Sequence, residues 1–204
     1  MREKEASTTL IYIRHGHTDF PSDRIYCDSR EDPPLSEKGR RQASGLLDLL
    51  SGVELSAIYA SPCARTLETA RPLAANRNMS VTSEERLRER HFGEWEGLYF
   101  HEIEQQYPEG YQRWKRDNAG FAPAGGETVY ALRDRLILAL TEMLVRHRGQ
   151  TIGVISHVGP IRVAISEAIE LPVAFYRRLT IDNASITSVS YGKSQNNLHF
   201  LNRR

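Results

Sequence analysis

The sequence predicts an α/β fold: a three-layer α/β/α sandwich in which helices cover both faces of a mostly parallel central sheet. Three short apolar segments, at residues 10–14, 55–60 and 151–156, have the length and composition of buried strands. Longer segments between them carry apolar residues at the spacing of three and four that is typical of helices. Parallel strands need such crossover connections, so this alternation indicates the fold class.

The first half of the chain contains two of these strands and two helices. A loop rich in proline, aspartate and serine follows the first strand over residues 21–34. A helix is expected to begin at Ser36, because apolar residues recur at helical spacing from there. The second strand leads into a helix over residues 61–75, in which Ser61 can cap the helix and Pro62 suits its first position.

The second half supplies the remaining elements of the predicted sandwich. Residues 80–83 are expected to form a short strand, and residues 126–147 the longest helix, with one apolar stripe along it. After the third buried strand, two further strands at 186–192 and 197–202 are expected to close the sheet as a pair.

Composition excludes several classes of protein. The length of 204 residues suits one domain over residues 1–204, with residues 1–8 as a flexible tail. The 27 basic and 26 acidic residues leave a net charge of +1, which predicts neither a nucleic-acid nor a membrane partner. Cys27 and Cys63 form no metal-binding or disulfide pattern. No signal peptide and no run of about 18 apolar residues is present, so we expect a cytoplasmic protein.

Polar side chains follow the three buried strands, at the edge where open α/β sheets bind ligands. The first strand ends in Arg14 and His15, the second is followed by Ser61 and Arg65, and the third by His157. Guanidinium and imidazole groups match the oxygens of a phosphate dianion. An imidazole nitrogen can also attack phosphorus and carry the phosphoryl group. These residues therefore predict a site for phosphoryl transfer.

Two further features fit this chemistry. Gly16 has no side chain, so we expect the backbone there to approach a ligand closely. A carboxylic acid could protonate the leaving oxygen and later activate water. The candidates for that acid are Glu89, Glu94 and Glu96, of which the last two are more typical of structural or solvated charges.

Six blocks of sequence occur in one order across nearly the whole chain. They are IRHGHT, PPLSEKGRRQA, IYASPCARTLETA, LRERHFGEWEG, PAGGET and GVISHVGPIR. In this the chain resembles the histidine phosphatase superfamily, which includes cofactor-dependent phosphoglycerate mutases and small phosphatases. The resemblance implies a phosphoglycerate mutase-like fold and a metal-independent phosphomonoesterase of the histidine acid phosphatase type. It implies no cofactor and a small phosphorylated metabolite as substrate, with the α-ribazole phosphatase type as the most similar kind of relative.

The resemblance also assigns a role to each matching residue. His15 matches the nucleophile that becomes phosphohistidine, and Glu89 matches the acid–base carboxylate. Arg14, Arg65 and His157 match the groups that hold the phosphoryl oxygens.

The chain departs from the family pattern at two positions near the nucleophile. His17 stands where the family usually has glutamate, and Pro21 stands where it usually has an asparagine that donates to the phosphate. We expect Gly16, His17 and Thr18 to contact substrate, with His17 tuning substrate choice at the rim. The residues that could replace the missing amide are Thr18, Ser22, Arg24 and Tyr26.

Several alternatives stay open at this point. His15 and His17 could form a metal pair, but two ligands without a third are thin support, and we expect no metal. Arg90 either reaches a second anionic group of the substrate or is a surface arginine. The aromatic residues after residue 106 either cover the pocket or pack two helices onto the core; they are Tyr107, Tyr111, Trp114 and Phe121.

The function itself has two alternatives besides hydrolysis. One is a phosphoglycerate mutase-like phosphoryl transferase, and the other is a non-catalytic relative that binds a phosphorylated ligand. The segment between the second helix and residue 87 is short, whereas the mutases have an extra segment there that keeps water out, so hydrolysis is favoured. A homodimer is compatible with the sequence.

Overall fold

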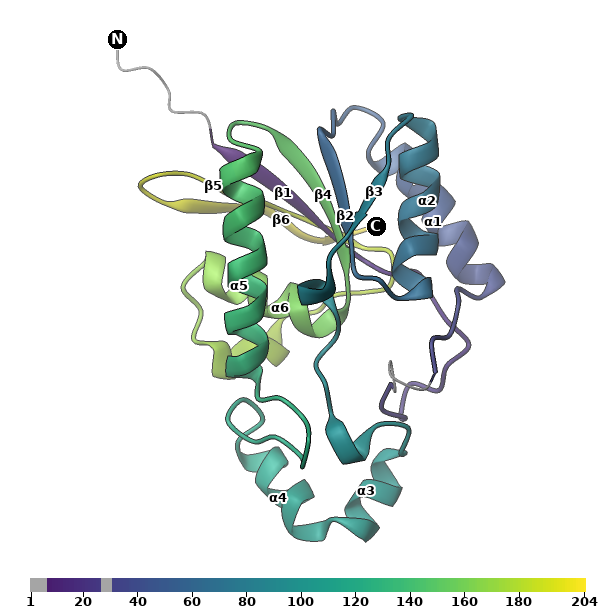
Figure 1. Ribbon diagram of the computed structural model, residues 1–204, viewed down its shortest axis with the longest axis vertical. Helices are drawn as coiled ribbons and strands as arrows, with labels where there is room; N and C mark the ends of the chain where they lie inside the picture. Colours follow the sequence, from purple (N-terminus) through teal and green to yellow (C-terminus); the bar gives the residue numbers. More distant parts are fainter. Residues whose placement is uncertain (1–6, 27–30) are drawn as a thin grey trace.

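A six-stranded sheet forms the centre of the molecule in the computed structural model, which describes residues 7–26 and 31–204 (Figure 1). The strand order is β3-β2-β4-β1-β5-β6. Neighbours from β3 to β1 run parallel, and β5 and β6 are antiparallel, which confirms a mostly parallel sheet with a closing strand pair. The strands are β1 (Thr8–Arg14), β2 (Ala57–Ala60), β3 (Val81–Ser83), β4 (Thr151–Ser156), β5 (Ile186–Tyr191) and β6 (Asn196–Arg203).

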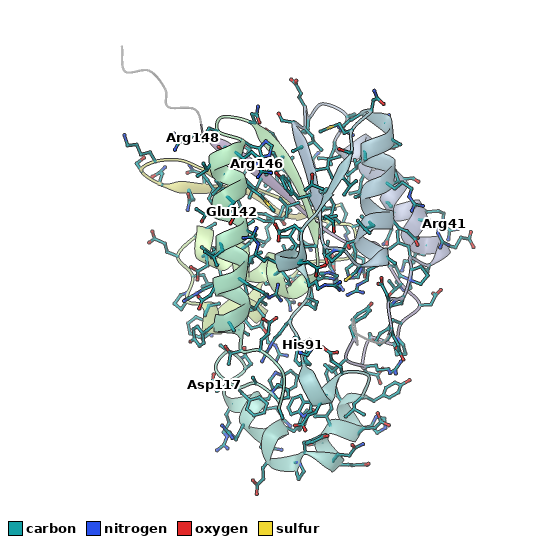
Figure 2. All side chains as sticks on the ribbon, viewed as in Figure 1. Arg41, His91, Asp117, Glu142, Arg146 and Arg148 are labelled. Atoms are coloured by element: carbon teal, nitrogen blue, oxygen red, sulfur yellow. The ribbon has the colours of Figure 1, made fainter. Side chains whose placement is uncertain are left out.

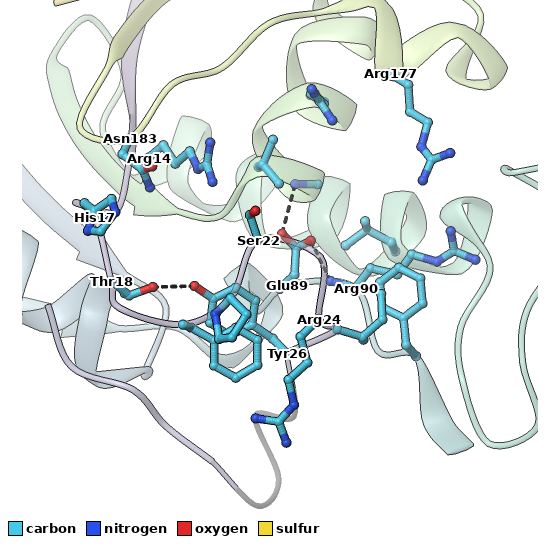
Figure 3. Close-up of a pocket in the computed structure, with 18 of the residues that line it drawn as sticks. Arg14, His17, Thr18, Ser22, Arg24, Tyr26, Glu89, Arg90, Arg177 and Asn183 are labelled. Atoms are coloured by element: carbon cyan, nitrogen blue, oxygen red, sulfur yellow. Dashed lines mark hydrogen bonds between the residues drawn. The ribbon is translucent and has the colours of Figure 1, made fainter. Parts of the chain in front are cut away.

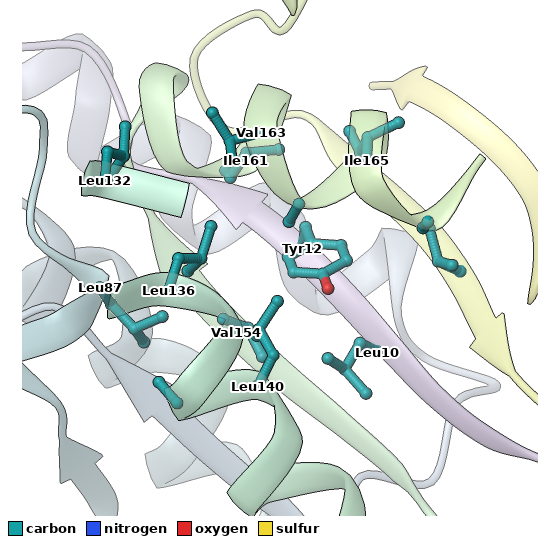
Figure 4. Close-up of a cluster of buried hydrophobic side chains, with 14 of the residues drawn as sticks. Leu10, Tyr12, Leu87, Leu132, Leu136, Leu140, Val154, Ile161, Val163 and Ile165 are labelled. Atoms are coloured by element: carbon teal, nitrogen blue, oxygen red, sulfur yellow. The ribbon is translucent and has the colours of Figure 1, made fainter. Parts of the chain in front are cut away.

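Helices cover both faces of this sheet because both faces of β1 are apolar. Ile11 and Ile13 pack with α1 (Glu37–Leu49) and α2 (Ala64–Asn76) on one face. Leu10 and Tyr12, which point the other way, pack with α5 (Val129–Arg146) and α6 (Val158–Ala168), as Figure 4 shows. The three-layer sandwich predicted from the sequence is therefore confirmed. Charged side chains such as Arg41 and Glu142 lie on the outward faces of α1 and α5 (Figure 2).

A small helical cap lies beyond one end of the sheet (Figure 1). It contains α3 (Phe100–Gln106) and α4 (Pro108–Arg116) and has its own apolar cluster around Trp95 and Trp114, whose ring centroids are 5.9 Å apart. The aromatic side chains Tyr107, Tyr111 and Phe121 pack against this cluster. Of the two alternatives for these residues, packing of the two helices is the one observed.

Short 3-10 helices connect the larger elements. They are η1 (Glu85–Leu87), η2 (Gly93–Trp95) and η3 (Val173–Arg178). The segments η1 and η2 lead from β3 to the cap, and η3 follows α6. None of the three was expected from the sequence pattern, because a single turn has no apolar period to reveal it.

The start of α2 differs from the prediction. The helix begins at Ala64 with Cys63 as its N-cap, so Ser61 does not cap it and Pro62 does not occupy its first position. The Ser61 hydroxyl is instead within hydrogen-bond distance of the ring of His157. The carboxylate of Asp32 accepts the backbone N–H of Ala64, with N–O distances of 2.9 and 2.8 Å. A residue from a distant loop has therefore taken the role that local sequence suggested for Ser61.

Ser36 does cap α1, because its hydroxyl accepts the N–H of Gly39 at 3.1 Å. At the N-terminus, Thr8 is already the first residue of β1, so the expected tail does not include it. Residues 1–6 of that tail, and Cys27, lie outside the described residues. Across the described chain, none of the helices combines the length and the apolar character needed to cross a membrane.

Candidate active site

Three strand ends deliver polar side chains to one place. The N–H of His15, just after β1, donates to the carbonyl of Ser156 at the end of β4, and the N–H of Ser61, just after β2, donates to the carbonyl of Ile155; both distances are 3.0 Å. The imidazole rings of His15 and His157 consequently lie with their centroids 5.3 Å apart. The parallel register of β1, β4 and β2 thus assembles residues that are far apart in the sequence.

The tautomer of His15 is set by its own backbone neighbour, Gly16. Nδ1 lies 2.8 Å from the carbonyl oxygen of Gly16, and a carbonyl oxygen can only accept, so Nδ1 carries the hydrogen. The lone pair is then on Nε2. Burial lowers the pKa of His15 well below its ordinary value, and the charges of Arg65 and Arg14 lower it further. The ring is therefore neutral near pH 7 and has a free nucleophilic nitrogen.

His157 is held beside the nucleophile. Its Nε2 lies 2.8 Å from the hydroxyl of Ser61, and burial together with the charge of Arg65 lowers the pKa of His157 well below its ordinary value. Its Nδ1 is buried and has no hydrogen-bond partner among the described residues. An unpaired buried polar atom costs free energy, and a ligand oxygen at this position would satisfy it.

Arg65 is fully buried at the N-terminus of α2. Its Nη1 lies 3.6 Å from the carboxylate of Asp32, and its guanidinium lies 4.3 Å from the centre of the Tyr26 ring. The same Asp32 carboxylate also accepts the backbone N–H of Ala64. The helix terminus and Arg65 together already bind one anionic side chain, which shows that this corner of the molecule stabilises negative charge.

Arg14 lies at the end of β1 and faces a pocket. Its Nη1 donates to the carbonyl of Ile181 at 2.7 Å, whereas its Nε is buried without a hydrogen-bond partner in residues 7–26 and 31–204. Burial lowers the pKa of Arg14, and the nearby carboxylate of Glu89 opposes that shift. Guanidinium groups start so far above neutral pH that Arg14 remains a cation.

Glu89 follows η1 and is held by two backbone amides. Its Oε2 accepts the N–H of Gly159 at 3.1 Å, at the start of α6, and its Oε1 accepts the N–H of Arg90 at 2.8 Å (Figure 3). A Cβ atom at residue 159 would lie 2.1 Å from Oε1, so only glycine leaves room for this carboxylate. The position of Glu89 therefore depends on a glycine from another element.

A pocket of about 310 Å³ opens beside these groups. Figure 3 shows Arg14, Glu89, His17 and Thr18 around it. The side chains of His15, Arg65 and His157 are buried below its surface. The structure thus brings together the five residues to which the sequence assigned catalysis, with Arg14 and Glu89 exposed to the pocket.

Two of the predicted binding residues have other tasks. A Cβ at Gly16 would lie 2.7 Å from the carbonyl oxygen of Gly39, so contact with α1 already requires glycine here. Arg90 is buried and its guanidinium donates to three carbonyl oxygens, those of Asn118, Phe121 and Glu127. The structure thus gives both residues a supporting role, and contact of either residue with substrate stays a prediction.

His17 and Thr18 line the pocket, and their contact with substrate stays a prediction. His17 Nδ1 lies 2.8 Å from the hydroxyl of Ser36, and the Thr18 hydroxyl lies 2.7 Å from that of Tyr26. No group of three potential metal ligands occurs in the described residues, so the pair of His15 and His17 gains no third ligand there.

The four candidates to replace the missing amide all line the pocket, namely Thr18, Ser22, Arg24 and Tyr26. Arg24 is bound to Glu31 and to the carbonyl of Gly97. Tyr26 is the one whose ring contacts that of His15, at a centroid distance of 6.3 Å. The Tyr26–Thr18 hydroxyl pair is thus better placed than Arg24.

The two other carboxylates of this region serve local structure. Glu96 is buried, accepts the N–H of Phe92 and lies 3.3 Å from Nε2 of His91, while Glu94 accepts the N–H of Ala124.

Sequence reasoning missed Arg162, Arg177 and Asn183, which also line the pocket. Asn183 donates from Nδ2 to the carbonyl of His15 at 3.2 Å. Arg162 belongs to the block GVISHVGPIR, so its position one turn into a helix could have been a signal. Arg177 and Asn183 belong to no recognised motif. Arg177 lies on η3, which packs against α6, and Asn183 follows η3 in the chain.

Comparisons with known proteins agree with this geometry. The sequence profile of the histidine phosphatase superfamily (branch 1) matches residues 10–204. Phosphoserine phosphatase 1 of Hydrogenobacter thermophilus is 32% identical over 193 residues, covering 95% of this chain and 91% of that protein. Adenosylcobalamin/alpha-ribazole phosphatase of Escherichia coli is 28% identical, covering 96% of each. The native structure of a mycobacterial glucosyl-3-phosphoglycerate phosphatase superposes with a TM-score of 0.87 at 28% identity, covering 97% of this chain and 100% of that one.

Proposed function

Since the chain belongs to the histidine phosphatase superfamily, we propose that it hydrolyses small phosphate monoesters through a phosphohistidine on His15. The observation that carries this proposal is the contact of His15 Nδ1 with the carbonyl of Gly16. That contact leaves Nε2 as a neutral nucleophile in a site rich in cations.

The first step forms the covalent intermediate. The Nε2 lone pair of His15 attacks phosphorus, a nitrogen–phosphorus bond forms, and the bond from phosphorus to the ester oxygen breaks. Glu89, in its protonated form, gives a proton to the leaving oxygen, so the alcohol departs neutral. Arg14 and Arg65 neutralise charge on the phosphoryl oxygens, and the neutral His157 donates a hydrogen bond to one of them.

The second step regenerates the protein. Glu89, now a carboxylate, takes a proton from a water molecule, whose oxygen attacks phosphorus. The nitrogen–phosphorus bond breaks, orthophosphate leaves, and His15 returns to its neutral state. The positive charge comes from the side chains, so we propose that hydrolysis needs no metal ion.

The relatives' names do not identify the alcohol part of this chain's substrate. Their names refer to phosphoserine, to adenosylcobalamin or α-ribazole, and to glucosyl-3-phosphoglycerate, compounds that are chemically different apart from the phosphate group. The shared feature is a small phosphate ester, and that is the substrate class we propose. The cytoplasmic location and the homodimer stay predictions.

The test is release of phosphate from p-nitrophenyl phosphate, with EDTA present, by the native chain and by His15→Ala. We expect turnover that survives EDTA and falls by more than about a thousandfold in the variant. His101→Ala, at an exposed position on α3, is the control and should keep the native rate. No release by the native chain would contradict hydrolysis and favour a mutase or a binding protein. Loss of turnover in EDTA would contradict the metal-free mechanism.

A further inference from the structure

The pocket beside the phosphate site carries more positive charge than one phosphoryl group requires. Among the described residues that line its volume of about 310 Å³, five are arginines and one, Glu89, is acidic. Cations that line a partly enclosed pocket attract anionic ligands. The arginines are Arg14, Arg24, Arg90, Arg162 and Arg177.

Three of these arginines already have a task. Arg24 forms two hydrogen bonds with the carboxylate of Glu31, at 2.9 and 3.0 Å. Arg90 donates to three backbone carbonyls. Arg14 is assigned to the phosphoryl group itself. The remaining two, Arg162 and Arg177, form no ion pair within residues 7–26 and 31–204.

Both remaining arginines are held in place without being neutralised. Arg162, on α6, donates from Nε to the carbonyl of Leu179 at 2.7 Å, which leaves the outer nitrogens of its guanidinium for another acceptor. Arg177, on η3, stacks over the ring of Trp114 at 4.4 Å. Figure 3 shows Arg177 on the side of the pocket opposite Arg14, with Glu89 between them in that view.

This arrangement has an electrostatic cost in the absence of an anion. Burial lowers the pKa of Arg162, Tyr176 and Glu89 oppose that shift, and the like charge of Arg177 adds a smaller lowering effect. Arg162 in turn contributes to the lowered pKa of Arg14, after the larger effect of burial. An anion between Arg162 and Arg177 would relieve the repulsion, because it favours the charged form of each.

We propose that Arg162 and Arg177 form a second anion subsite, and that the substrate is a phosphate ester whose leaving alcohol carries its own anionic group. Guanidinium forks bind carboxylates and phosphates with similar geometry, so the group is a carboxylate or a second phosphate. The inference rests on the proposed function, because it takes the phosphoryl group to lie at His15 and Arg14. The alcohol then extends across the pocket toward η3.

The test compares ligands that differ only in the second anionic group. 3-Phosphoglycerate is paired with glycerol 3-phosphate, and glucose 1,6-bisphosphate with glucose 6-phosphate. Dissociation constants are measured by titration calorimetry in the His15→Ala protein, so that no ligand is consumed. In at least one pair, the member with the extra anion should bind about tenfold more tightly or better. The pair that shows the preference identifies the group as carboxylate or phosphate.

Adjacent arginines provide a matched control. Arg177→Gln should reduce that preference to less than about threefold. Arg178→Gln removes the same charge from a side chain that stacks on Phe175 and does not line the pocket, so the preference should remain. Arg162→Gln should act like Arg177→Gln.

Two results would overturn the subsite. One is equal affinity within both pairs, and the other is an equal loss of preference in Arg177→Gln and Arg178→Gln, which would indicate only a general charge effect. Failure of the proposed function is a separate result, because it appears as absent turnover of p-nitrophenyl phosphate by the native chain and does not alter the binding comparison.

Discussion

The ring nitrogen Nδ1 of His15 lies 2.8 Å from the carbonyl oxygen of Gly16, the next residue in the chain. The orientation of the nucleophile therefore depends on backbone geometry and not on a neighbouring carboxylate. Because Gly16 packs directly on Gly39, helix α1 supports that geometry. This relationship leads to the first prediction, which concerns the glycine and not the histidine.

Gly16→Ala should destabilise the protein by about 1–3 kcal/mol, because the new Cβ would lie 2.7 Å from the backbone oxygen of Gly39, which cannot move aside as a side chain could. Denaturant unfolding of the variant measures the loss. Gly45→Ala is the matched control, since Gly45 lies within α1 and a Cβ there would meet no atom within 4 Å. That substitution should stabilise the protein by about 0.5–1 kcal/mol. Equal effects of the two substitutions would contradict the proposed contact.

Stability should fall as the pH drops below about 6.5, the ordinary pKa of histidine. Burial holds the pKa values of His15 and His157 well below that value in the folded protein. Below pH 6.5 the unfolded chain binds two protons that the folded protein does not, so unfolding is favoured. The free energy of unfolding should decrease by up to about 2.7 kcal/mol per pH unit until the folded pKa values are reached. Unfolding curves between pH 7.5 and about 5, above the titration of most carboxylates, measure this slope.

Two histidine variants separate this effect from other titrations. His15→Asn removes one of the two groups, so the slope should decrease to about 1.4 kcal/mol per pH unit. His101→Asn changes an exposed histidine and should leave the slope as it is in the native chain. If His15→Asn also left the slope unchanged, His15 would not be the buried neutral group described here.

Glu89→Gln should slow hydrolysis to a degree that depends on the leaving alcohol. The amide keeps the shape of the side chain but cannot give a proton, and an alkyl alkoxide needs that proton far more than nitrophenolate does. We expect a loss of about 10²–10⁴ in kcat for glycerol 3-phosphate and a much smaller loss for p-nitrophenyl phosphate. An equal loss for both esters would show that Glu89 positions the substrate and transfers no proton.

Local sequence pattern was enough to predict most of the fold and the centre of the site. Apolar runs gave the strands, helical spacing gave α1 and α5, and the residues after β1 and β4 were expected at the ligand-binding edge because parallel strands end there together. The errors came from contacts between distant residues. Asp32 caps α2 in place of Ser61. Close packing against Gly39 of α1 is the reason for glycine at position 16.

The far wall of the pocket could not be predicted for the same reason. Arg177 reaches it because η3 packs beside α6, and nothing in the sequence near Arg177 shows this. For Arg162, the only signal was its place in the block GVISHVGPIR. That role was one of two alternatives for Arg90, whose guanidinium donates hydrogen bonds to carbonyls of the segment before α5. Which arginine is free to bind an anion is decided by these long-range hydrogen bonds.

The contact between Gly159 and Glu89 gives the last prediction. A Cβ at residue 159 would lie 2.1 Å from Oε1 of Glu89, the end of a flexible side chain, so Gly159→Ala should displace the carboxylate while the backbone stays in place. We expect kcat for glycerol 3-phosphate to fall by about 10–100-fold, since a small misplacement of a catalytic group has such effects. The melting temperature should change little, because only the carboxylate has to move.

A double variant decides whether this loss acts through Glu89. If alanine at residue 159 acts only by moving the carboxylate, Gly159→Ala combined with Glu89→Gln should be no slower than Glu89→Gln alone. Independent effects would instead multiply, and the double variant would then be slower than either single variant. Multiplied losses would mean that the first turn of α6 affects catalysis by another route, such as the position of His157 at its N-cap. The glycine at this position would then serve the phosphoryl-binding histidine and not the acid–base group.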